Sequence, residues 1–260
     1  MRYLKGSLDL KFQDRELLHL AADARYIKHS QLFQLSLLKT AEYRRAIFNW
    51  RIRRLVTGGL LRKLVIPQFG KTNALYSVTR GGFDALEWMG VTYLGGGYEQ
   101  DKHPSDMQLC HVLELNEIRL ALECSGILQS WTPEVFIRVL NLCPSLRYAK
   151  TYDAVVKVSL GHEIACEFAI EYERTLKSER RYESVVEAIA NEKRLQVILY
   201  LTSSYEVAST LRSLLQHVQA RILLAHVDKF KRDLLDTQVD VIGSYQRIPL
   251  RAALTDLART

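Results

Sequence analysis

Three consecutive glycines, Gly95 to Gly97, divide the sequence into two parts with different hydrophobic patterns. The segment that follows them, residues 98–105 (YEQDKHPS), is polar, contains a proline and shows no apolar periodicity. Glycine and proline both disfavour the interior of helices and strands, so a segment of this composition is typical of a linker. We therefore predict an N-terminal domain over residues 1–97, a linker over residues 98–105 and a second domain over residues 106–260.

The basic excess of the chain lies on the N-terminal side of this boundary. The 260 residues carry a net charge of +7, but residues 1–105 hold 17 Lys and Arg against 9 Asp and Glu, whereas residues 106–260 hold 19 against 20. This asymmetry predicts that the first domain binds a polyanion. The apolar fraction of 48% excludes a disordered chain, and no apolar run is long enough to span a membrane. We expect a cytoplasmic protein without a membrane partner.

The first domain has the pattern of three short helices, a two-stranded hairpin and a closing helix. Apolar residues recur at helical spacing in the first part, and two short β-like runs follow a pair of glycines. The expected elements occupy, in order, residues 15–24, a short helix capped by Ser30, residues 40–57, residues 60–67, residues 74–78 and residues 79–90. This order is typical of a winged helix-turn-helix domain, in which the third helix enters the major groove of DNA.

The third of these helices is rich in arginine. Tyr43, Ala46, Ile47 and Trp50 fall on one face, which we predict to contact the core, with the basic residues and an asparagine pointing away from it. Arginine can form two hydrogen bonds with guanine and asparagine two with adenine, while lysines of the wing can neutralise phosphates. The residues predicted to bind DNA are Arg44, Arg45, Asn49, Arg51 and Arg53 of the helix and Lys63 and Lys71 of the wing.

Double-stranded DNA is the partner that the charge, the helix order and the wing favour together. Two other interpretations fit the same helix, namely a solvated amphipathic face and a face that binds an acidic protein surface, and RNA stays open as a ligand. Winged-helix proteins often read paired half-sites, so a homodimer is compatible with this interpretation, although the sequence contains no heptad repeat that would indicate an interface.

The second domain changes from helical to alternating periodicity. After a long amphipathic helix, two runs of alternating residues predict a hairpin within residues 151–173. Asp153 and Lys157 project from one face of its first strand, and acidic residues that include Glu171 and Glu173 collect on one face of its second strand. Helical and strand patterns then alternate, which predicts an α/β sheet with crossover connections. These later elements are expected at residues 176–194, 195–201, 205–219, 222–225 and 239–242.

Three short motifs occur in a fixed order in this second domain. A helix reads H-x-L-x-x-N-x-x-R, a strand contains Tyr152-Asp153-Ala154, and the next strand ends in Glu171-Tyr172-Glu173-Arg174-Thr175. Together with the winged helix and the linker, this order resembles the replication-relaxation family of bacterial mobile-element proteins, in which the two strands read like PDA and ELDRGT. The helical motif consists of His111, Leu113, Asn116 and Arg119.

The resemblance implies a fold and a role. It implies a winged-helix DNA-binding domain joined to an α/β domain with the topology of restriction endonucleases, the PD-(D/E)xK fold. It further implies a protein that acts in the transcription, replication or mobilisation of a bacterial mobile element such as a plasmid. The resemblance covers most of the chain, through motifs that are short.

The resemblance also implies a site. A nuclease of the PD-(D/E)xK fold holds Mg²⁺ with two carboxylates and uses a lysine to position water or the phosphate. Asp153 and Glu171 would be the metal ligands, Glu173 a further acidic candidate and Lys157 the lysine, with Lys177 in the following turn a less favoured one. The sequence departs from the expected pattern twice, because Tyr152 replaces the proline and no lysine stands two residues after Glu171, where Glu173 is found instead.

Two hypotheses follow for the whole chain. The favoured one is a sequence-recognising DNA-binding protein whose nuclease-like domain is non-catalytic, needs no cofactor and mediates assembly. It predicts that the acidic residues form salt bridges with the nearby Arg174, Arg180 and Arg181. In the alternative, Asp153, Glu171, Glu173 and Lys157 form the catalytic site of a Mg²⁺-dependent endonuclease that the winged helix directs to its target.

Overall fold

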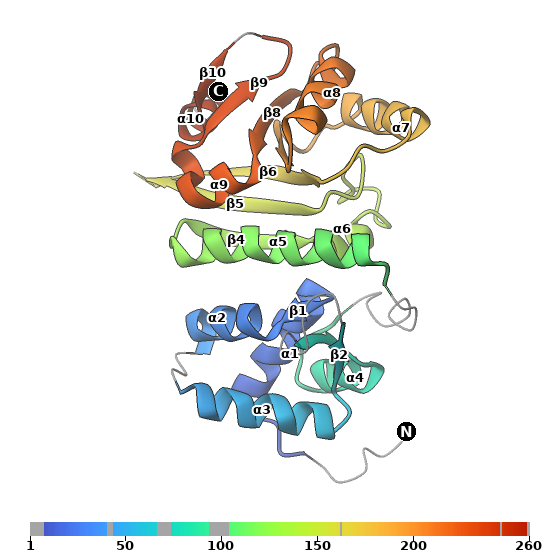
Figure 1. Ribbon diagram of the computed structural model, residues 1–260, viewed down its shortest axis with the longest axis vertical. Coiled ribbons are helices and arrows are strands. Elements are labelled where there is room, and N and C mark those ends of the chain that lie inside the picture. The colour runs from blue at the N-terminus through green and yellow to red at the C-terminus, as the bar shows by residue number, and fades with distance from the viewer. Residues whose placement is uncertain are drawn as a thin grey trace. The chain divides into compact units, whose positions relative to one another are not determined.

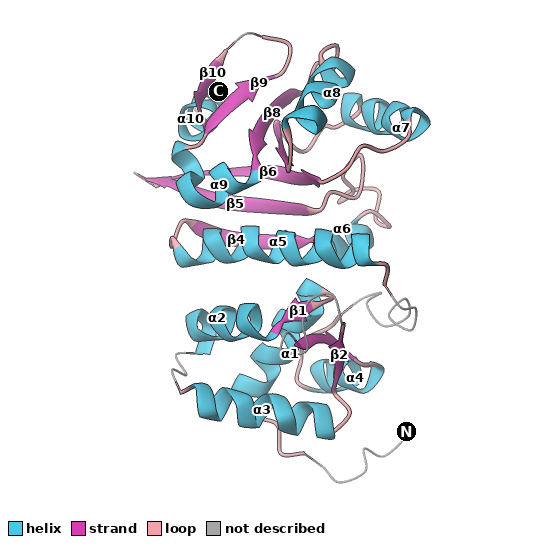
Figure 2. Ribbon diagram, viewed as in Figure 1, coloured by secondary structure: helices cyan, strands magenta, loops and turns pink. Residues whose placement is uncertain are grey.

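The structure is a computed structural model, and it divides the chain into two compact units, Met1–Leu120 and Ala121–Thr260. Each unit is described by itself, with its elements labelled in Figure 1 and coloured by type in Figure 2. Within the part of the chain that the structure describes, no helix is both long and apolar enough to cross a membrane. The described residues are 8–40, 44–66, 74–93, 104–161, 163–244 and 246–258.

The first unit combines helices with a small antiparallel sheet of strand order β1-β3-β2. The element order agrees with the expected three helices, hairpin and closing helix, with one short strand added between the first two helices, and it is compatible with a winged helix-turn-helix. Residues 67–73, between β2 and β3, lie outside the described residues. The elements are α1 (Phe12–Ala24), β1 (Ile27–Lys28), α2 (His29–Thr40), α3 (Arg45–Thr57), β2 (Leu61–Val65), β3 (Ala74–Val78), α4 (Arg80–Trp88) and the greater part of α5 (Asp106–Cys124).

Helix α3 packs through a different face from the predicted one. Phe48, Ile52 and Leu55 are buried at spacings of four and three residues, which places them on one side of the helix. Ala46 is exposed, and Trp50 is 51% exposed. The helix contains two apolar stripes at helical spacing, and the stripe that holds the larger aliphatic side chains is the one that enters the core. The prediction that Ala46 and Trp50 contact the core is therefore wrong.

A buried carboxylate, that of Asp14, fixes α3 against α1. Its Oδ1 accepts a hydrogen bond from Arg51 Nη1 at 3.2 Å, and its Oδ2 accepts one from Arg54 Nη2. Oδ2 also accepts from the backbone N–H of Lys11 at 2.9 Å, so Asp14 closes the first turn of α1 from its third position rather than from the position before the helix. The carboxylate of Asp14 is completely buried.

Helix α5 belongs largely to the first unit, contrary to the predicted boundary. Asn116 Nδ2 donates to the backbone oxygen of Tyr26 at 2.8 Å, and Arg119 Nη1 lies 3.1 Å from Asp23 Oδ2. Both motif residues are buried by this packing. The division between the two compact units falls after Leu120, whereas the sequence predicts that the second domain begins at residue 106. Most of the expected linker, residues 98–103, lies outside the described residues.

The second unit is built on one mixed sheet of strand order β10-β9-β8-β7-β6-β5-β4. The neighbours β6, β7 and β8 are parallel, and all the other pairs are antiparallel. Helices α7 and α8 connect the parallel strands, so the predicted α/β sheet with crossovers is confirmed (Figure 2). The elements are β4 (Leu128–Pro133), α6 (Glu134–Leu140), β5 (Ala154–Gly161), β6 (Ile164–Glu173), α7 (Glu179–Ala190), β7 (Val197–Thr202), α8 (Tyr205–Leu215), β8 (Arg221–His226), α9 (Val227–Asp233), η2 (Leu234–Asp236), β9 (Gln238–Val241), β10 (Arg247–Pro249) and α10 (Leu250–Ala258).

Helices α7 and α8 cover the face of the sheet on which the candidate carboxylates lie. Ile198 and Ile222 of neighbouring strands form one apolar cluster with Ile189 of α7 and Leu211 of α8. All six positions of β7 are buried, which explains why its sequence is a continuous apolar run rather than an alternating one. Glu171 lies on this covered face, because it pairs in register with Tyr200, two residues along β7 from Ile198.

We expect the substitution Asp14→Ala to destabilise the chain strongly. It leaves two partly buried arginines of α3 without their counter-charge, and breaking such a pair costs about 3 kcal/mol or more of unfolding free energy. Urea unfolding followed by circular dichroism measures the change. The control is Glu134→Ala, which removes the partner of Arg138 in a more exposed pair and should cost at most about 1 kcal/mol. A loss for Asp14→Ala no larger than that of the control would contradict the assigned role.

Candidate functional site

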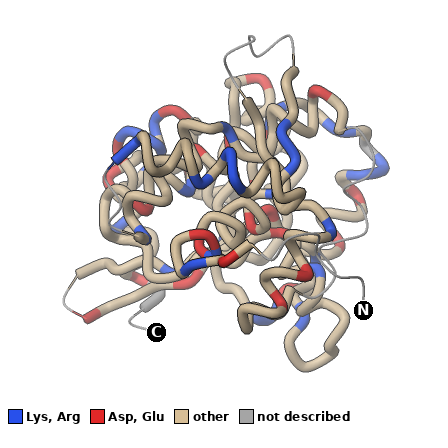
Figure 3. The backbone as a smooth tube through the Cα atoms, turned by 90° about the horizontal axis from the view of Figure 1, so that it is seen from below, with Lys and Arg blue, Asp and Glu red and all other residues tan. Residues whose placement is uncertain are grey.

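The exposed face of α3 is basic. Arg45, Asn49 and Arg53 are exposed and follow one another at spacings of four residues, so they lie on one side of the helix. Arg44, immediately before the helix, is exposed as well. Helix α3 contains four arginines and no acidic residue, and Figure 3 marks the positions of basic and acidic residues along the backbone. The exposed polar residues Arg44, Arg45, Asn49 and Arg53 thus point away from the core, as predicted.

Arg51 does not share this outward orientation. Its side chain is only 12% exposed, and its guanidinium lies against Asp14 inside the first unit. The neighbouring Arg54 is directed to the same carboxylate. The prediction that Arg51 points away from the core is wrong, because a buried acid on α1 holds its charged group.

His29 connects three elements next to this basic face and was not singled out from the sequence. Its Nε2 lies 2.9 Å from Asn49 Oδ1, and its Nδ1 lies 3.1 Å from the hydroxyl oxygen of Tyr76. A carboxamide oxygen can only accept, so Nε2 carries the proton and donates it, while Nδ1 accepts from the tyrosine. The ring also meets Phe48 edge to face at a centroid distance of 5.0 Å. His29 thus orients the side chain of Asn49.

The surroundings of His29 keep its ring neutral. Burial lowers its pKa below the usual 6.5, the hydrogen bond to Asn49 opposes this shift, and the positive charges of Arg45 and Lys63 lower the pKa further. The two cations therefore lie close to the same ring, one from α3 and one from β2. Sequence spacing does not reveal the arrangement, because His29 and Asn49 are 20 residues apart.

The wing contributes one described basic residue of the two that were predicted. Lys63 is exposed on β2, where it pairs in register with Tyr76 of β3. Lys71 lies outside the described residues, as does Tyr43 before α3. The described basic surface thus consists of the outward residues of α3 and the exposed Lys63 on β2.

In the second unit, the predicted carboxylates do come together. Ala154 pairs with Ile170, so the preceding residue Asp153 lies opposite Glu171 at the end of β5. Asp153 Oδ2 accepts a hydrogen bond from the backbone N–H of Tyr172 at 2.8 Å. Glu173 follows on the same face of β6 as Glu171, and both are only 4% exposed.

Two lysines, rather than the arginines expected from the sequence, pair with these glutamates. Lys150 Nζ lies 2.6 Å from Glu171 Oε2, and Lys177 Nζ lies 2.6 Å from Glu173 Oε2. Lys150 also lies over the ring of Tyr152, 5.2 Å from its centroid. We refer to Lys150, Asp153, Glu171, Glu173 and Lys177 as the carboxylate–lysine cluster.

Burial dominates the electrostatics of this cluster. It raises the pKa of Glu171 to about 7, against the attraction of Lys150, and the negative charge of Asp153 raises the pKa further. Two buried polar atoms, Glu171 Oε1 and the hydroxyl oxygen of Tyr200, have no hydrogen-bond partner among the described residues. Glu171 and Tyr200 are direct neighbours in the pairing of β6 with β7.

Lys157, the lysine predicted for this site, is not part of the cluster. It is exposed on β5 and pairs in register with Glu167. It also lies four residues from Asp153, which corresponds to about 13 Å along an extended strand. Among the described residues, no three His, Cys, Asp or Glu side chains are grouped so that they could hold a metal ion. The structure therefore does not bring Lys157 together with Asp153 and Glu171.

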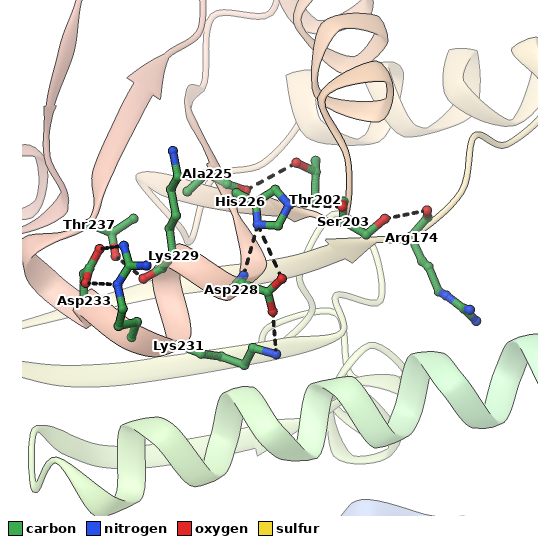
Figure 4. A network of polar contacts seen from close by, with 11 residues as sticks. Arg174, Thr202, Ser203, Ala225, His226, Asp228, Lys229, Lys231, Asp233 and Thr237 are labelled. Atoms are coloured by element: carbon green, nitrogen blue, oxygen red, sulfur yellow. Dashed lines mark hydrogen bonds and ion pairs between the residues drawn. The ribbon is translucent and has the colours of Figure 1, made fainter. Parts of the chain in front are cut away.

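A second polar network lies where the parallel strands β7 and β8 end (Figure 4). His226 Nδ1 accepts from the backbone N–H of Asp228 at 3.2 Å, and His226 Nε2 lies 3.1 Å from the backbone oxygen of Ser203. The hydroxyl of Ser203 donates to the backbone oxygen of Arg174 at 2.8 Å. The imidazole therefore caps α9 and binds a neighbouring loop, and the serine hydroxyl points to a different partner. This network holds the strand ends together and does not form a Ser–His catalytic pair.

The chain has low similarity to known proteins. No protein-family model matches its sequence, and no curated protein matches it. Two solved structures of a MarR mutant from E. coli, one of them complexed with operator DNA, align at 19% identity with a TM-score of 0.26. The alignments cover 40% of this chain and 71% and 73% of those chains. A similarity at this level does not establish a shared fold or function.

The lowered pKa of His29 predicts a loss of stability in mild acid. The unfolded chain binds a proton at His29 near pH 6.5, while the folded chain does so only at lower pH. The stabilisation is therefore complete above about pH 6.5 and is lost as the pH falls below it. The variant His29→Gln should show a weaker dependence on pH between about 7.5 and 5, measured by urea unfolding. The other histidines are common to both proteins, so parallel curves would contradict the prediction.

Proposed function

We propose that this chain is a double-stranded DNA-binding protein that uses α3 as its recognition helix and the β2–β3 hairpin as a wing. The observation that carries this proposal is the stripe of Arg45, Asn49 and Arg53 on the exposed face of α3, with Lys63 on the adjacent strand. The element order helix, strand, helix, helix, strand, strand supports it, because in a winged helix the third helix is the one presented to the major groove.

The chemistry of this face suits the edges of base pairs. The guanidinium groups of Arg45 and Arg53 can each donate two hydrogen bonds to a guanine, and the carboxamide of Asn49 can bond an adenine. His29 orients that carboxamide before DNA arrives, which reduces the entropy lost on binding. Lys63 can neutralise a phosphate without reading sequence. The arrangement thus combines base recognition with backbone contacts.

The resemblance to the replication-relaxation family suggests the setting of this activity. We propose a role in the transcription, replication or mobilisation of a bacterial mobile element, with the second unit serving in assembly. The second unit supports the resemblance through its order of β4, β5 and β6 as an antiparallel meander, followed by α7 and the parallel strand β7. A homodimer that reads paired half-sites is the assembly that fits this role.

Substitutions on α3 and β2 should separate recognition of bases from binding to phosphates. We expect Arg45→Ala and Asn49→Ala each to cost about 1–3 kcal/mol on a duplex selected from a random library, and little on a shuffled duplex. Lys63→Ala should weaken both duplexes equally and reduce the dependence of log K on log salt concentration by about one. Fluorescence anisotropy titrations at several salt concentrations measure all three.

The matched control is Lys193→Ala, which removes one exposed positive charge from the second unit and should leave both titrations unchanged. If the wild-type protein binds no duplex, the proposed function fails. If it binds but the variants of α3 and β2 behave like the control, the protein binds DNA through another surface.

A metal-dependent endonuclease is the second candidate function. The observation that favours it is the pair formed by Asp153 and Glu171, opposite each other on adjacent strands. The lysines bound to Glu171 and Glu173 argue against it, since they occupy oxygens that a metal would need. We therefore rank it below DNA binding without cleavage.

Supercoiled plasmid separates these two functions in one incubation. We expect the plasmid to stay supercoiled with Mg²⁺ or Mn²⁺, as it does with EDTA, because the lysine-bound carboxylates do not bind the metal. Agarose gel electrophoresis measures the outcome. Metal-dependent cleavage that Asp153→Asn abolishes in a folded protein would establish the endonuclease instead.

A further inference from the structure

The carboxylate–lysine cluster lies where the resemblance implies a Mg²⁺ site, and its residues can be tested for that ion. A Mg²⁺ ion takes six oxygen ligands at about 2.1 Å in nearly octahedral geometry. In the cluster, Oε2 of Glu171 and Oε2 of Glu173 each bind an ammonium group at 2.6 Å. A divalent cation on either oxygen would meet a positive charge at close range, so the residues as arranged do not fit the ion.

The two ammonium groups come from the segments that flank the hairpin. Lys150 lies four residues before β5, and Lys177 lies four residues after the last residue of β6. Both are well covered, with side chains that are 16% and 28% exposed. The backbone N–H of Lys177 additionally donates to the hydroxyl of Tyr182 at 3.3 Å. These lysines are therefore held at the cluster by packing as well as by charge.

The two ammonium groups also explain how the sheet can hold an additional acid, Glu173. Glu173 stands two residues after Glu171, where the PD-(D/E)xK pattern has a lysine, and it adds a second buried glutamate beside Glu171. An additional buried carboxylate is strongly destabilising unless a cation accompanies it. Lys177 provides that cation for Glu173, as Lys150 does for Glu171.

We propose that Lys150 and Lys177 take the place of a divalent cation in this cluster, so that the second unit is a metal-independent scaffold closed by two internal ion pairs. Two ammonium charges equal the charge of one Mg²⁺ ion. Each ion pair joins a flanking segment to the C-terminal end of the interior strand β6, a connection that a bound cation would otherwise provide. The proposal concerns the second unit alone and does not depend on DNA binding by the first.

The proposal predicts that removal of the lysines frees the two glutamates to gather with Asp153 around a metal ion, which the lysine-bound arrangement does not allow. The double variant Lys150→Met, Lys177→Met leaves the buried Glu171 and Glu173 without their ammonium partners, and methionine keeps much of the volume of lysine. We expect it to bind Mn²⁺ on the order of tenfold or more tighter than the wild-type protein, and to regain with Mn²⁺ the thermal stability that it loses without it. Adding Asp153→Asn to the double variant should remove this binding.

The experiment uses the full chain, isothermal titration calorimetry with Mn²⁺, and thermal unfolding with and without Mn²⁺. The control Lys157→Met removes one positive charge from β5, outside the cluster, so it should behave like the wild-type protein. Circular dichroism establishes that each variant is folded, and the single variant Lys177→Met replaces the double variant if the latter does not fold.

Two results would overturn the proposal. The first is Mn²⁺ binding by the wild-type protein that Asp153→Asn abolishes, since the cluster would then accept a metal in the presence of both lysines. The second is a folded lysine variant that binds Mn²⁺ no better than Lys157→Met. Absence of Mn²⁺ binding by the wild-type protein, together with binding by the lysine variant, supports it.

Discussion

The contact between Asp14 and the arginines of α3 determines which side of that helix is available to a ligand. A helix with arginines at positions 51, 53 and 54 can present them in more than one direction, because successive residues are 100° apart. The buried Asp14 carboxylate binds two guanidinium groups from the same side of α3. Arg51 and Arg54 provide them, because residues three apart lie on the same side of a helix. Arg45, Asn49 and Arg53 then face outward. The basic face of α3 is thus set by an acid on a different helix.

The sequence predicted the order of elements well and the rotation of α3 poorly. Turn residues, caps and periodicity placed three helices, a hairpin and a closing helix, because these signals are local. The core face of α3 was wrong because Trp50 and Phe48 both belong to apolar stripes at helical spacing, and only tertiary packing distinguishes them. For the same reason the role of His29 was not predicted, because it depends on tertiary contacts with Asn49 and Tyr76 that no sequence spacing indicates. The same reason applies to α5, whose motif asparagine and arginine pack on the first unit.

In the second unit, the acidic half of the cluster was predictable and the basic half was not. Side chains alternate between the two faces of a strand, and the hairpin register fixes which residues lie opposite each other. These two rules place Asp153 and Glu171 on the same face. Lys150 and Lys177 lie in irregular segments outside the strands, where the sequence has no periodicity that would predict the direction of a side chain. Lys157 shares a face of its strand with Asp153, but the distance along the strand separates it from the cluster. Lys177, which had been less favoured, is the lysine that reaches Glu173.

Both units use the same physical rule to divide their basic residues between the interior and the surface. A buried carboxylate must be accompanied by a cation, so the positions of the acids decide which bases become structural. In the first unit, Asp14 and Asp23 engage Arg51, Arg54 and Arg119, and the charge left for a polyanion is smaller than the composition suggests. In the second unit the rule acts on lysines, and two of them offset the charges of Glu171 and Glu173 on the covered face of the sheet. A count of charges therefore predicts which half binds a polyanion, but only the acids in the interior indicate which basic residues stay exposed for such a ligand.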